Sequence, residues 1–403
     1  MLPSVQQPVA ATTDGLRAAV QRFMSVDDMT LGEGKDFAVR FRGRLLMEST
    51  QAYAMAAESF RQLGYTALFR KEGDTHVVLA VAGTINPGPS RVWINYLMFG
   101  LTVLSVWFTG STYGASGALP ATAGEWLPFL ASGVPFVVAM LGILLSHELG
   151  HYFAARYHKV AVTLPYFIPF PLSPFGTMGA FIQLKSPPTN RRVLLDIGIA
   201  GPLAGFIVAI PVLLFGLLTS PVSPIPTVIP PGQAMQFEGN SILYVLAKLL
   251  VFGRLLPAPA SFGGLPPLLY MLRFYLLGLP APLGGSDVML NSVAWAGWAG
   301  LLVTGLNLIP AGQLDGGHAL YVLIGRNARR LVPVIIAVLI ALGFVWTGWF
   351  LWAAIIFFLG RTFAEPLDQI TELDPTRRLL AILALVIFVL VITPVPLAVI
   401  QGG

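Results

Sequence analysis

The stretch GILLSHELGHYFAARYH, residues 142–158, places ionisable side chains at the end of a long apolar run. The run begins near FLASGVPFVVAML (129–141) and is long enough to cross a bilayer. His147, Glu148 and His151 therefore lie where hydrocarbon is expected. Ionisable side chains at that depth are costly, so they are a functional-site hypothesis by default.

These residues form the pattern H-E-x-x-H. On a helix, two residues four apart are separated by about 40° around the axis, so both imidazoles point to one side and can share a metal ion. Glu148 is offset by about 100°, beside the metal, where a base would take a proton from the attacking water. Two histidines leave room on zinc for one more protein ligand and a water. The pattern therefore predicts a metal site rather than a chance match.

The third ligand should be a His, Asp or Glu at membrane depth. Asp315 follows a later apolar span, lies among glycines and is expected on the same side of the membrane as His147 and His151. His318 could compete, although as an early residue of a short helix it is better explained as a supporting or structural group. Asp196 starts the third predicted span a few residues after two arginines, so ion pairing or helix capping explains it better. We favour Asp315.

The composition is that of a membrane protein. Of 403 residues, 55% are hydrophobic and 11% charged, whereas a soluble protein has about 25% charged residues. Cysteine is absent, which excludes disulfides and thiolate metal sites. We interpret the net charge of +5 as Lys and Arg gathered on one side of a bilayer, so no nucleic-acid partner is expected.

The chain divides into four parts. FAVRFRGRLL (37–46) alternates like a strand, STQAYAMAAESFRQLGY (49–65) has helical spacing, and two further strands meet at 72–74. The predicted parts are a flexible start with a possible short helix (1–36), a small β-α-β-β soluble domain (37–85), a Pro/Gly linker (86–91) and a transmembrane domain (92–403).

We expect a mainly α-helical polytopic fold with about six or seven transmembrane helices. The segment 161–188 is apolar but rich in Pro and Gly, so it is neither a regular helix nor a lipid-exposed strand. A membrane-embedded β-hairpin, shielded by protein, is the consistent interpretation. The predicted spans are about 92–111, 127–157, 196–219, 288–309, 332–360 folded as a hairpin with a bend at 347–348, and 379–399.

Basic residues mark one side of the membrane. Most Lys and Arg of the loops can lie on a single side, and the positive-inside rule makes that side the cytoplasm. The N-terminal domain and the opening of the metal site are then expected on the same cytoplasmic side. We expect an integral protein of a bacterial plasma (inner) membrane.

The motifs together resemble the site-2 protease family of intramembrane zinc metalloproteases. They are HELGH, NLIPAGQLDG (307–316), and GTMGAFI (176–182) and GIAGPLAG (198–205) between them. The likeness covers roughly residues 92–400 and is greatest to bacterial and plastid members without an inserted PDZ domain, the plastid branch being linked to gravitropism.

The resemblance implies residue roles. His147, His151 and Asp315 would bind Zn²⁺, Glu148 would be the catalytic base, and Asn307 would contact substrate on the oxyanion side. Asn307 could instead be a polar helix-packing residue. The resemblance further implies a hairpin strand that holds unwound substrate by strand addition, formed by Gly176, Thr177, Met178, Gly179, Ala180, Phe181 and Ile182.

The sequence thus predicts a zinc endopeptidase that cleaves transmembrane segments of membrane-spanning protein substrates near the cytoplasmic face by metal-activated water. The alternative is a metal-ion transporter or sensor that uses the same ligands. A transporter needs polar residues along other spans, and these are scarce here. Gly201 and Gly205 indicate close helix packing and no chemistry. The domain at 37–85 is expected to bind an unknown partner.

Overall fold

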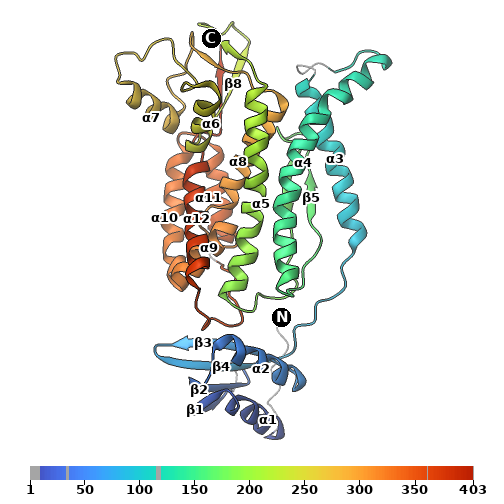
Figure 1. Cartoon of the computed structure of the whole chain (residues 1–403), viewed down its shortest axis with the longest axis vertical. Coiled ribbons are helices and arrows are strands. Elements are labelled where there is room, and N and C mark those ends of the chain that lie inside the picture. The colour runs from blue at the N-terminus through green and yellow to red at the C-terminus, as the bar shows by residue number, and fades with distance from the viewer. Residues whose placement is uncertain (1–9, 33–35, 115–118, 361, 403) are drawn as a thin grey trace.

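The computed structural model describes residues 10–32, 36–114, 119–360 and 362–402. A tall helical region stands above a small α/β unit, and the linker between them, residues 83–91, runs into the first long helix (Figure 1). The N-terminal unit is the lower part of this view, and the helical region contains the predicted metal site.

The N-terminal unit is a four-stranded antiparallel sheet in the order β1-β2-β4-β3, with two helices on it. Its elements are α1 (Ala10–Gln21), β1 (Met24–Leu31), β2 (Val39–Leu45), α2 (Ser49–Gln62), β3 (Tyr65–Glu72) and β4 (Thr75–Ala82). The turn between β3 and β4 has Gly73 at φ +59°, a conformation that favours glycine.

Helix α1 and strand β1 belong to this unit, although we expected a flexible start with only a short helix. Leu16, Val20 and Phe23 are fully buried against the sheet together with Phe41 and Phe69. The strand is hard to predict because its pairing with β2 shifts register between residues 26 and 28. Such a bulge breaks the two-residue alternation that identifies strands.

Among the described residues, three helices are long and apolar enough to cross a membrane: α3 (Val92–Gly114), α4 (Trp126–Tyr157, preceded by a 3-10 turn at Ala123–Glu125) and α5 (Arg191–Leu218). Helix α4 packs against both α3 and α5. These three match the first three predicted spans. The later predicted spans form shorter helices, so six or seven spans are not reached by length alone.

The shorter helices complete the bundle beside α5 (Figure 1). A break at residues 344–347 separates two of them, next to the predicted bend. Their bounds are α8 (Ser292–Asn307), α9 (Asp315–Ile324), α10 (Ala328–Gly343, after a 3-10 turn at Gly325–Asn327), α11 (Gly348–Leu359) and α12 (Pro375–Val391).

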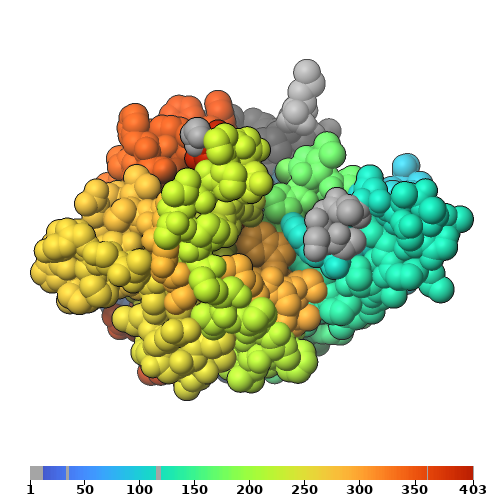
Figure 2. Space-filling view, turned by 90° about the horizontal axis from the view of Figure 1, so that it is seen from above, coloured from blue at the N-terminus to red at the C-terminus, as the bar shows by residue number. Residues whose placement is uncertain are grey.

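The end of the bundle far from the N-terminal unit is covered by residues 220–291. Figure 2 shows this face, where those yellow residues lie on one side, the turn before α4 projects on the other, and a hollow lies between them. The elements are β7 (Val222–Pro224), β8 (Ala234–Glu238), α6 (Ile242–Phe252), α7 (Pro267–Leu277) and β9 (Ser286–Val288). Strand β8 pairs with the C-terminal strand β10 (Leu397–Gln401), and β7 pairs with β9.

The predicted hairpin is formed by β5 (Tyr166–Pro169) and β6 (Thr177–Phe181). The backbone nitrogen of Thr163 donates to the Gln183 carbonyl (3.0 Å), so the ladder continues past β6. The hairpin tip is fixed to α3, because the Ser105 hydroxyl donates to the Gly176 carbonyl (2.6 Å). A Cβ at Gly176 would lie 2.6 Å from the Cα of Val106, so only glycine fits there.

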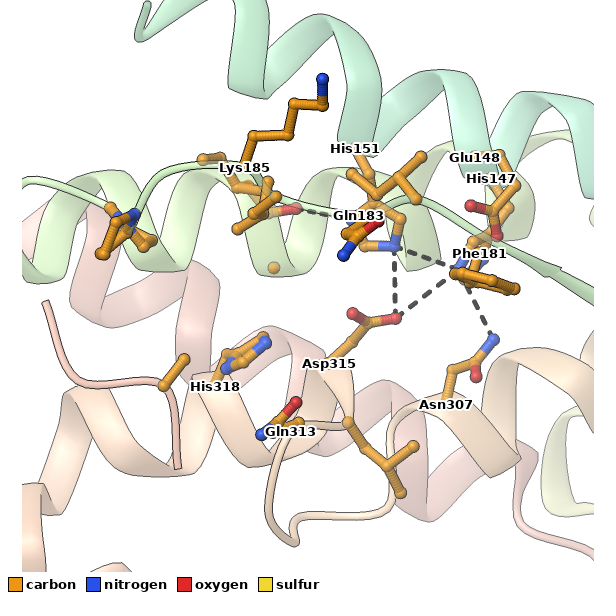
Figure 3. A pocket seen from close by; sticks show the side chains of 18 of the residues that line it. His147, Glu148, His151, Phe181, Gln183, Lys185, Asn307, Gln313, Asp315 and His318 are labelled. Atoms are coloured by element: carbon orange, nitrogen blue, oxygen red, sulfur yellow. Dashed lines mark hydrogen bonds and ion pairs between the residues drawn. The ribbon is translucent and has the colours of Figure 1, made fainter. Parts of the chain in front are cut away.

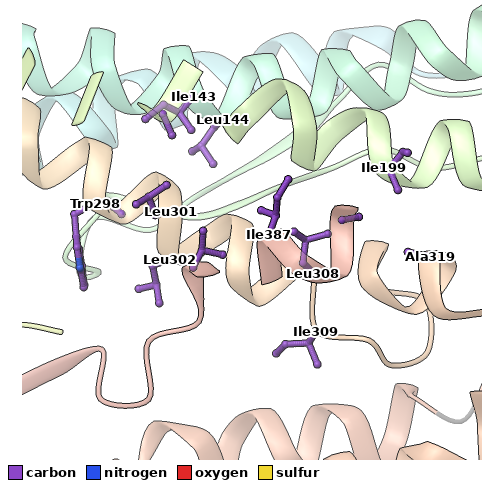
Figure 4. Close-up of a cluster of buried hydrophobic side chains, with 14 of the residues drawn as sticks. Ile143, Leu144, Ile199, Trp298, Leu301, Leu302, Leu308, Ile309, Ala319 and Ile387 are labelled. Carbon is purple, nitrogen blue, oxygen red and sulfur yellow. The ribbon is translucent and has the colours of Figure 1, made fainter. Parts of the chain in front are cut away.

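One buried apolar cluster joins α4, α5, α8, α9 and α12 (Figure 4). Ile143 of α4 and Leu301 of α8 are 2% exposed, and Ala319 of α9 is fully buried. Because interiors are close-packed, this cluster fixes α9 relative to α4. Helix α4 carries the two histidines, and α9 begins with Asp315.

Candidate metal centre

The two histidines of α4 and the first residue of α9 come together (Figure 3). The Nε2 atoms of His147 and His151 are 3.2 Å apart. Oδ2 of Asp315 lies 3.5 Å from His147 Nε2 and 3.4 Å from His151 Nε2. Ligands at about 2.0–2.1 Å from a tetrahedral zinc are separated by about 3.3 Å. The triangle of donor atoms therefore fits one zinc ion.

The hydrogen bond of His151 shows what these atoms offer. Its Nδ1 lies 2.7 Å from the backbone carbonyl oxygen of Ile197, which can only accept, so Nδ1 carries the proton. Nε2 of His151 then presents a lone pair toward His147 Nε2 and the Asp315 carboxylate. Several electron-pair donors facing one point repel each other unless a cation lies among them. A carbonyl that orients a histidine in this way is typical of metal ligands.

Glu148 has a different environment from the three donors. It is 5% exposed, lines the same cavity, and its Oε2 has no hydrogen-bond partner among the residues described. A buried carboxylate oxygen without a partner is costly to leave unsatisfied. This oxygen is therefore available to a water or a substrate in the cavity, as the base of the motif requires.

Asn307, the last residue of α8, lies near His147 (Figure 3). Its Nδ2 is 3.5 Å from His147 Nε2, too far for a strong hydrogen bond. The amide is thus beside the metal site and lines its cavity. Both a substrate contact and a packing role are compatible with this position.

Glycines in the loop after α8 position Asp315. Gly312 has φ +56°, and a Cβ there would lie 2.5 Å from the Cα of Gly360. A Cβ at Gly316 would lie 1.9 Å from the Leu308 carbonyl oxygen. These close approaches explain why glycine follows the aspartate in LDGG, since the start of α9 folds back on the end of α8.

Glycines of α5 make room for the imidazoles. A Cβ at Gly201 would lie 2.1 Å from His151 Nε2, and one at Gly205 would lie 3.1 Å from the Cβ of His147. The sequence pattern predicts only a packing role for these glycines and does not by itself place them opposite the histidines. Their four-residue spacing equals that of His147 and His151, which is the signal that could have revealed it.

The two competing candidates for the third ligand lie elsewhere. Asp196 pairs with His158 Nε2 (2.9 Å) and with Arg377 Nη2 (2.7 Å), an ion pair that joins α5 to the end of α4 and the start of α12. His318 is half-buried in the cavity wall, but the three-donor group is His147, His151 and Asp315. Asp315 is thus the candidate that the fold brings to the histidines.

The donors open into a cavity of ≈ 660 Å³. Of the predicted substrate strand, Ala180, Phe181 and Ile182 line this cavity, whereas Gly176, Thr177, Met178 and Gly179 do not. The lining continues along the chain through Gln183–Pro188. The opposite wall contains Gln313, Leu314, Ala364 and Glu365.

Comparison with known proteins bears on the family. The model of Peptidase family M50 matches residues 135–349, which include both predicted ligand motifs. The chain is 32% identical over 272 residues to "Probable zinc metalloprotease EGY1, chloroplastic" of Arabidopsis thaliana, covering 66% of this chain and 44% of that protein. It is 30% identical over 398 residues to "Probable zinc metalloprotease EGY2, chloroplastic" of Arabidopsis thaliana, covering 96% of this chain and 65% of that protein.

A third relative, "Probable zinc metallopeptidase EGY3, chloroplastic" of Arabidopsis thaliana, is 26% identical over 262 residues, or 62% of this chain and 40% of that protein. The chain spans about half the length of these relatives. Their names give no support to the expected bacterial inner membrane. No solved structure matches the chain.

The family match covers more than half of the 403 residues and contains the residues that meet at the candidate metal centre. The expected membership of the site-2 protease family is thereby confirmed. The chain belongs to Peptidase family M50.

Proposed function

We propose that this protein is a zinc endopeptidase that hydrolyses peptide bonds within membrane-spanning segments of protein substrates. The observation that supports it most is the convergence of His147 Nε2, His151 Nε2 and Asp315 Oδ2 within 3.2–3.5 Å, next to an unpartnered oxygen of Glu148. Three donors, with no fourth protein ligand in the described part of the chain, leave an open position, which is typical of catalytic rather than structural zinc sites.

The residues have separate roles in this proposal. His147, His151 and Asp315 hold the zinc, which supplies Lewis-acid polarisation of the scissile carbonyl and lowers the pKa of water. Glu148 takes the proton from the attacking water and delivers it to the leaving amine. Asn307 donates a hydrogen bond to the carbonyl oxygen as negative charge develops there.

The cavity suits an extended peptide. One edge of the 177–185 strand is paired with 161–169, and residues 180–185 of this strand line the cavity. A substrate helix hides its carbonyl groups in its own hydrogen bonds, so it must unwind locally before hydrolysis. Strand addition along residues 180–185 would give the freed backbone groups new partners.

The membrane arrangement is part of the proposal. We infer that α8, α10, α11 and α12 cross the bilayer with the three long helices and that the β5–β6 hairpin is embedded among them. The N-terminal unit lies at the end of the bundle where the first turns of α5 and α12 contain arginines. The positive-inside rule puts this end on the side of the membrane where the protein is synthesised. Cleavage is then expected near that face. The four-part division of the chain is retained, with the soluble domain extended to include α1 and β1.

The test uses the purified full chain with dye-labelled casein as an unfolded peptide substrate. Membrane proteomes are also compared between cells that express the wild type and cells that express Glu148→Gln. The wild type should contain one zinc per chain and cleave, Glu148→Gln should keep zinc and lose cleavage, and His147→Ala should lose both. A Glu148→Gln enzyme that cleaves at the wild-type rate would overturn the mechanism.

A further inference from the structure

The segment 364–371, between α11 and α12, connects the cavity of the metal site, here also called the cleft, with the N-terminal unit. We call it the strap. Its first residues, Ala364 and Glu365, line the cavity of the metal site. Leu367 and Ile370, a few residues on, pack against the apolar core of the N-terminal unit. One short segment thus contacts both parts of the molecule.

The strap pairs with the edge of the sheet of the N-terminal unit through a parallel β-bridge. The backbone nitrogen of Phe69 donates to the Leu367 carbonyl (2.9 Å), and that of Gln369 donates to the Phe69 carbonyl (3.1 Å). Phe69 belongs to β3, the edge strand of the sheet, and its bridge to Asp368 is parallel. Main-chain pairing at a free sheet edge is a common way in which proteins bind extended segments.

The other edge of the strap binds the residues that precede α5. The Leu367 nitrogen donates to the Pro188 carbonyl (3.1 Å), and the Asp368 nitrogen donates to the Thr189 carbonyl (2.7 Å). Pro187 and Pro188 also line the cavity. The strap therefore connects two parts of the cavity lining, residues 187–188 and residues 364–365, to the same sheet edge.

Side chains secure this pairing. Asp368 is 1% exposed and accepts hydrogen bonds from the Ser49 hydroxyl (3.0 Å), from the Ile370 nitrogen (2.8 Å) and from the Thr371 hydroxyl. Arg70 Nη1 donates to the Leu367 carbonyl (2.8 Å). A buried carboxylate held by several donors is a strong, specific contact, because each loss leaves a charged group unsatisfied.

Glu365 links this contact to the helical region. Arg329 of α10 pairs with its Oε1 at 2.7 Å, and Gln369 Nε2 donates to its Oε2 at 2.8 Å. Glu365 thus contacts the bundle through Arg329 and the strap through Gln369, whose nitrogen donates to the Phe69 carbonyl. A shift of the strap would move a wall of the cleft.

We propose that the N-terminal unit is a clamp on the mouth of the cleft, and that Ser49, Arg70 and Asp368 are positioning residues for substrate entry. With the strap paired to β3, the wall at 364–365 and the wall at 187–188 have fixed positions. When the pairing is lost, the mouth widens and extended peptide loses one of the surfaces that receive it. The effect on peptide binding rests on the proposed peptidase function, whereas the effect on access to the metal does not.

Four variants of the zinc-loaded full chain separate the outcomes. Asp368→Ala removes the central contact, Ser49→Ala removes one donor, and Ser49→Thr keeps a hydroxyl as the conservative rescue. Glu58→Ala is the matched control, because Glu58 is exposed on α2 and its described partners, Arg61 and Gln62, belong to its own helix.

Hydrogen exchange over residues 65–72 and 366–371 measures docking, and the rate at which 1,10-phenanthroline removes zinc measures access. Both should rise several-fold in Asp368→Ala, less in Ser49→Ala, and stay at wild-type values in Ser49→Thr and Glu58→Ala. On labelled casein, KM should rise about tenfold with kcat within about twofold, as expected for a coupling between two sites. Zinc content at saturation should not change.

Unchanged exchange in Asp368→Ala would overturn the clamp, and so would faster exchange with unchanged zinc removal. If the wild type does not cleave casein at all, the proposed peptidase function fails, and the clamp is judged by exchange and zinc removal alone. A purely structural role for Asp368 predicts instead a lower zinc content and a parallel loss of kcat in Asp368→Ala, which would also contradict the proposal.

Discussion

Two clusters of buried ionisable groups lie in the helical region, and only one of them contains its own cation. In the first, His147, His151 and Asp315 direct electron pairs toward one point. In the second, Lys248 of α6 is fully buried, with Nζ 3.7 Å from Asp287 Oδ1 and 3.9 Å from Glu238 Oε1. The charge of the second cluster is largely balanced by the protein itself.

The second cluster joins elements that are far apart in the sequence. It links β8, α6 and β9, and the Lys248 ammonium also lies 4.4 Å from the ring centroid of Tyr244. Tyr244 donates its hydroxyl hydrogen to Glu238 Oε1 (2.8 Å). The Lys248 ammonium makes no hydrogen bond to a described residue, but its charge faces two carboxylates, as in a structural ion pair. Burial of charge alone does not mark a functional site, whereas donors that lack a cation do.

The largest expected effect is on catalysis at the first cluster. Glu148→Gln keeps the shape of the side chain but removes the base, so kcat/KM should fall by about 10³-fold with unchanged zinc content. Cleavage of labelled casein and metal analysis of the same preparation check this. Equal losses of zinc and activity would show that Glu148 supports the ligands rather than the proton transfer.

A substitution at the second cluster, Lys248→Met, should lower the free energy of unfolding without changing the zinc content. Lys248→Met leaves Glu238 and Asp287 buried without a cation, which costs about 3–5 kcal/mol. Denaturant unfolding in detergent measures this loss, with the exposed Lys71→Met as control. A loss of zinc in Lys248→Met at temperatures where the fold persists would remove the distinction between the clusters.

A smaller effect is expected where α5 faces the ligands. Gly201→Ala introduces a Cβ 2.1 Å from His151 Nε2, so the imidazole must shift and zinc affinity should fall about 10- to 100-fold. The control is Gly142→Ala on α4, where an added Cβ meets nothing within 4 Å. Competition with a zinc chelator of known affinity gives both values. Equal affinities in the two variants would contradict the packing of Gly201 on His151.

The three donors that the fold brings together could be predicted from the sequence, whereas the contacts around them could not. His147, Glu148 and His151 share one helix, so their geometry follows from local spacing, and Asp315 was selected by depth and by its glycine neighbours. The pairing of β8 with β10 joins residues about 160 apart, and the docking of the strap on β3 joins Phe69 with Asp368. Such non-local contacts leave no periodic signal in either segment.

The later predicted spans form shorter helices than expected for a related reason. Hydropathy extends through residues such as Leu308 and Ile309, which are buried and apolar, but the backbone leaves the helix there to present Asp315. Apolar composition predicts burial and not helix length. The same holds at residues 344–347, where an apolar stretch contains the break between α10 and α11.

The smallest predicted effect concerns a partly exposed group in the N-terminal unit. Burial, followed by nearby Lys71 and Arg44, lowers the pKa of His76 below 6.5, and its Nδ1 accepts a hydrogen bond from the Leu45 nitrogen. The neutral form is favoured by folding, so its contribution is present above pH 6.5 and is lost as the pH falls through the lowered pKa. The protection of residues 39–45 against hydrogen exchange, corrected for the intrinsic pH dependence of amide exchange, should therefore fall on acidification, and less in His76→Gln. An identical pH dependence in both proteins would contradict this.

X-ray absorption at the zinc edge of the purified full chain tests the central claim most directly. The account predicts one zinc per chain with two imidazole nitrogens and oxygen ligands at about 2.0–2.1 Å, and a reduced zinc content in Asp315→Asn. A chain that binds no zinc, or zinc bound by fewer than two imidazoles and unaffected by Asp315→Asn, would contradict it.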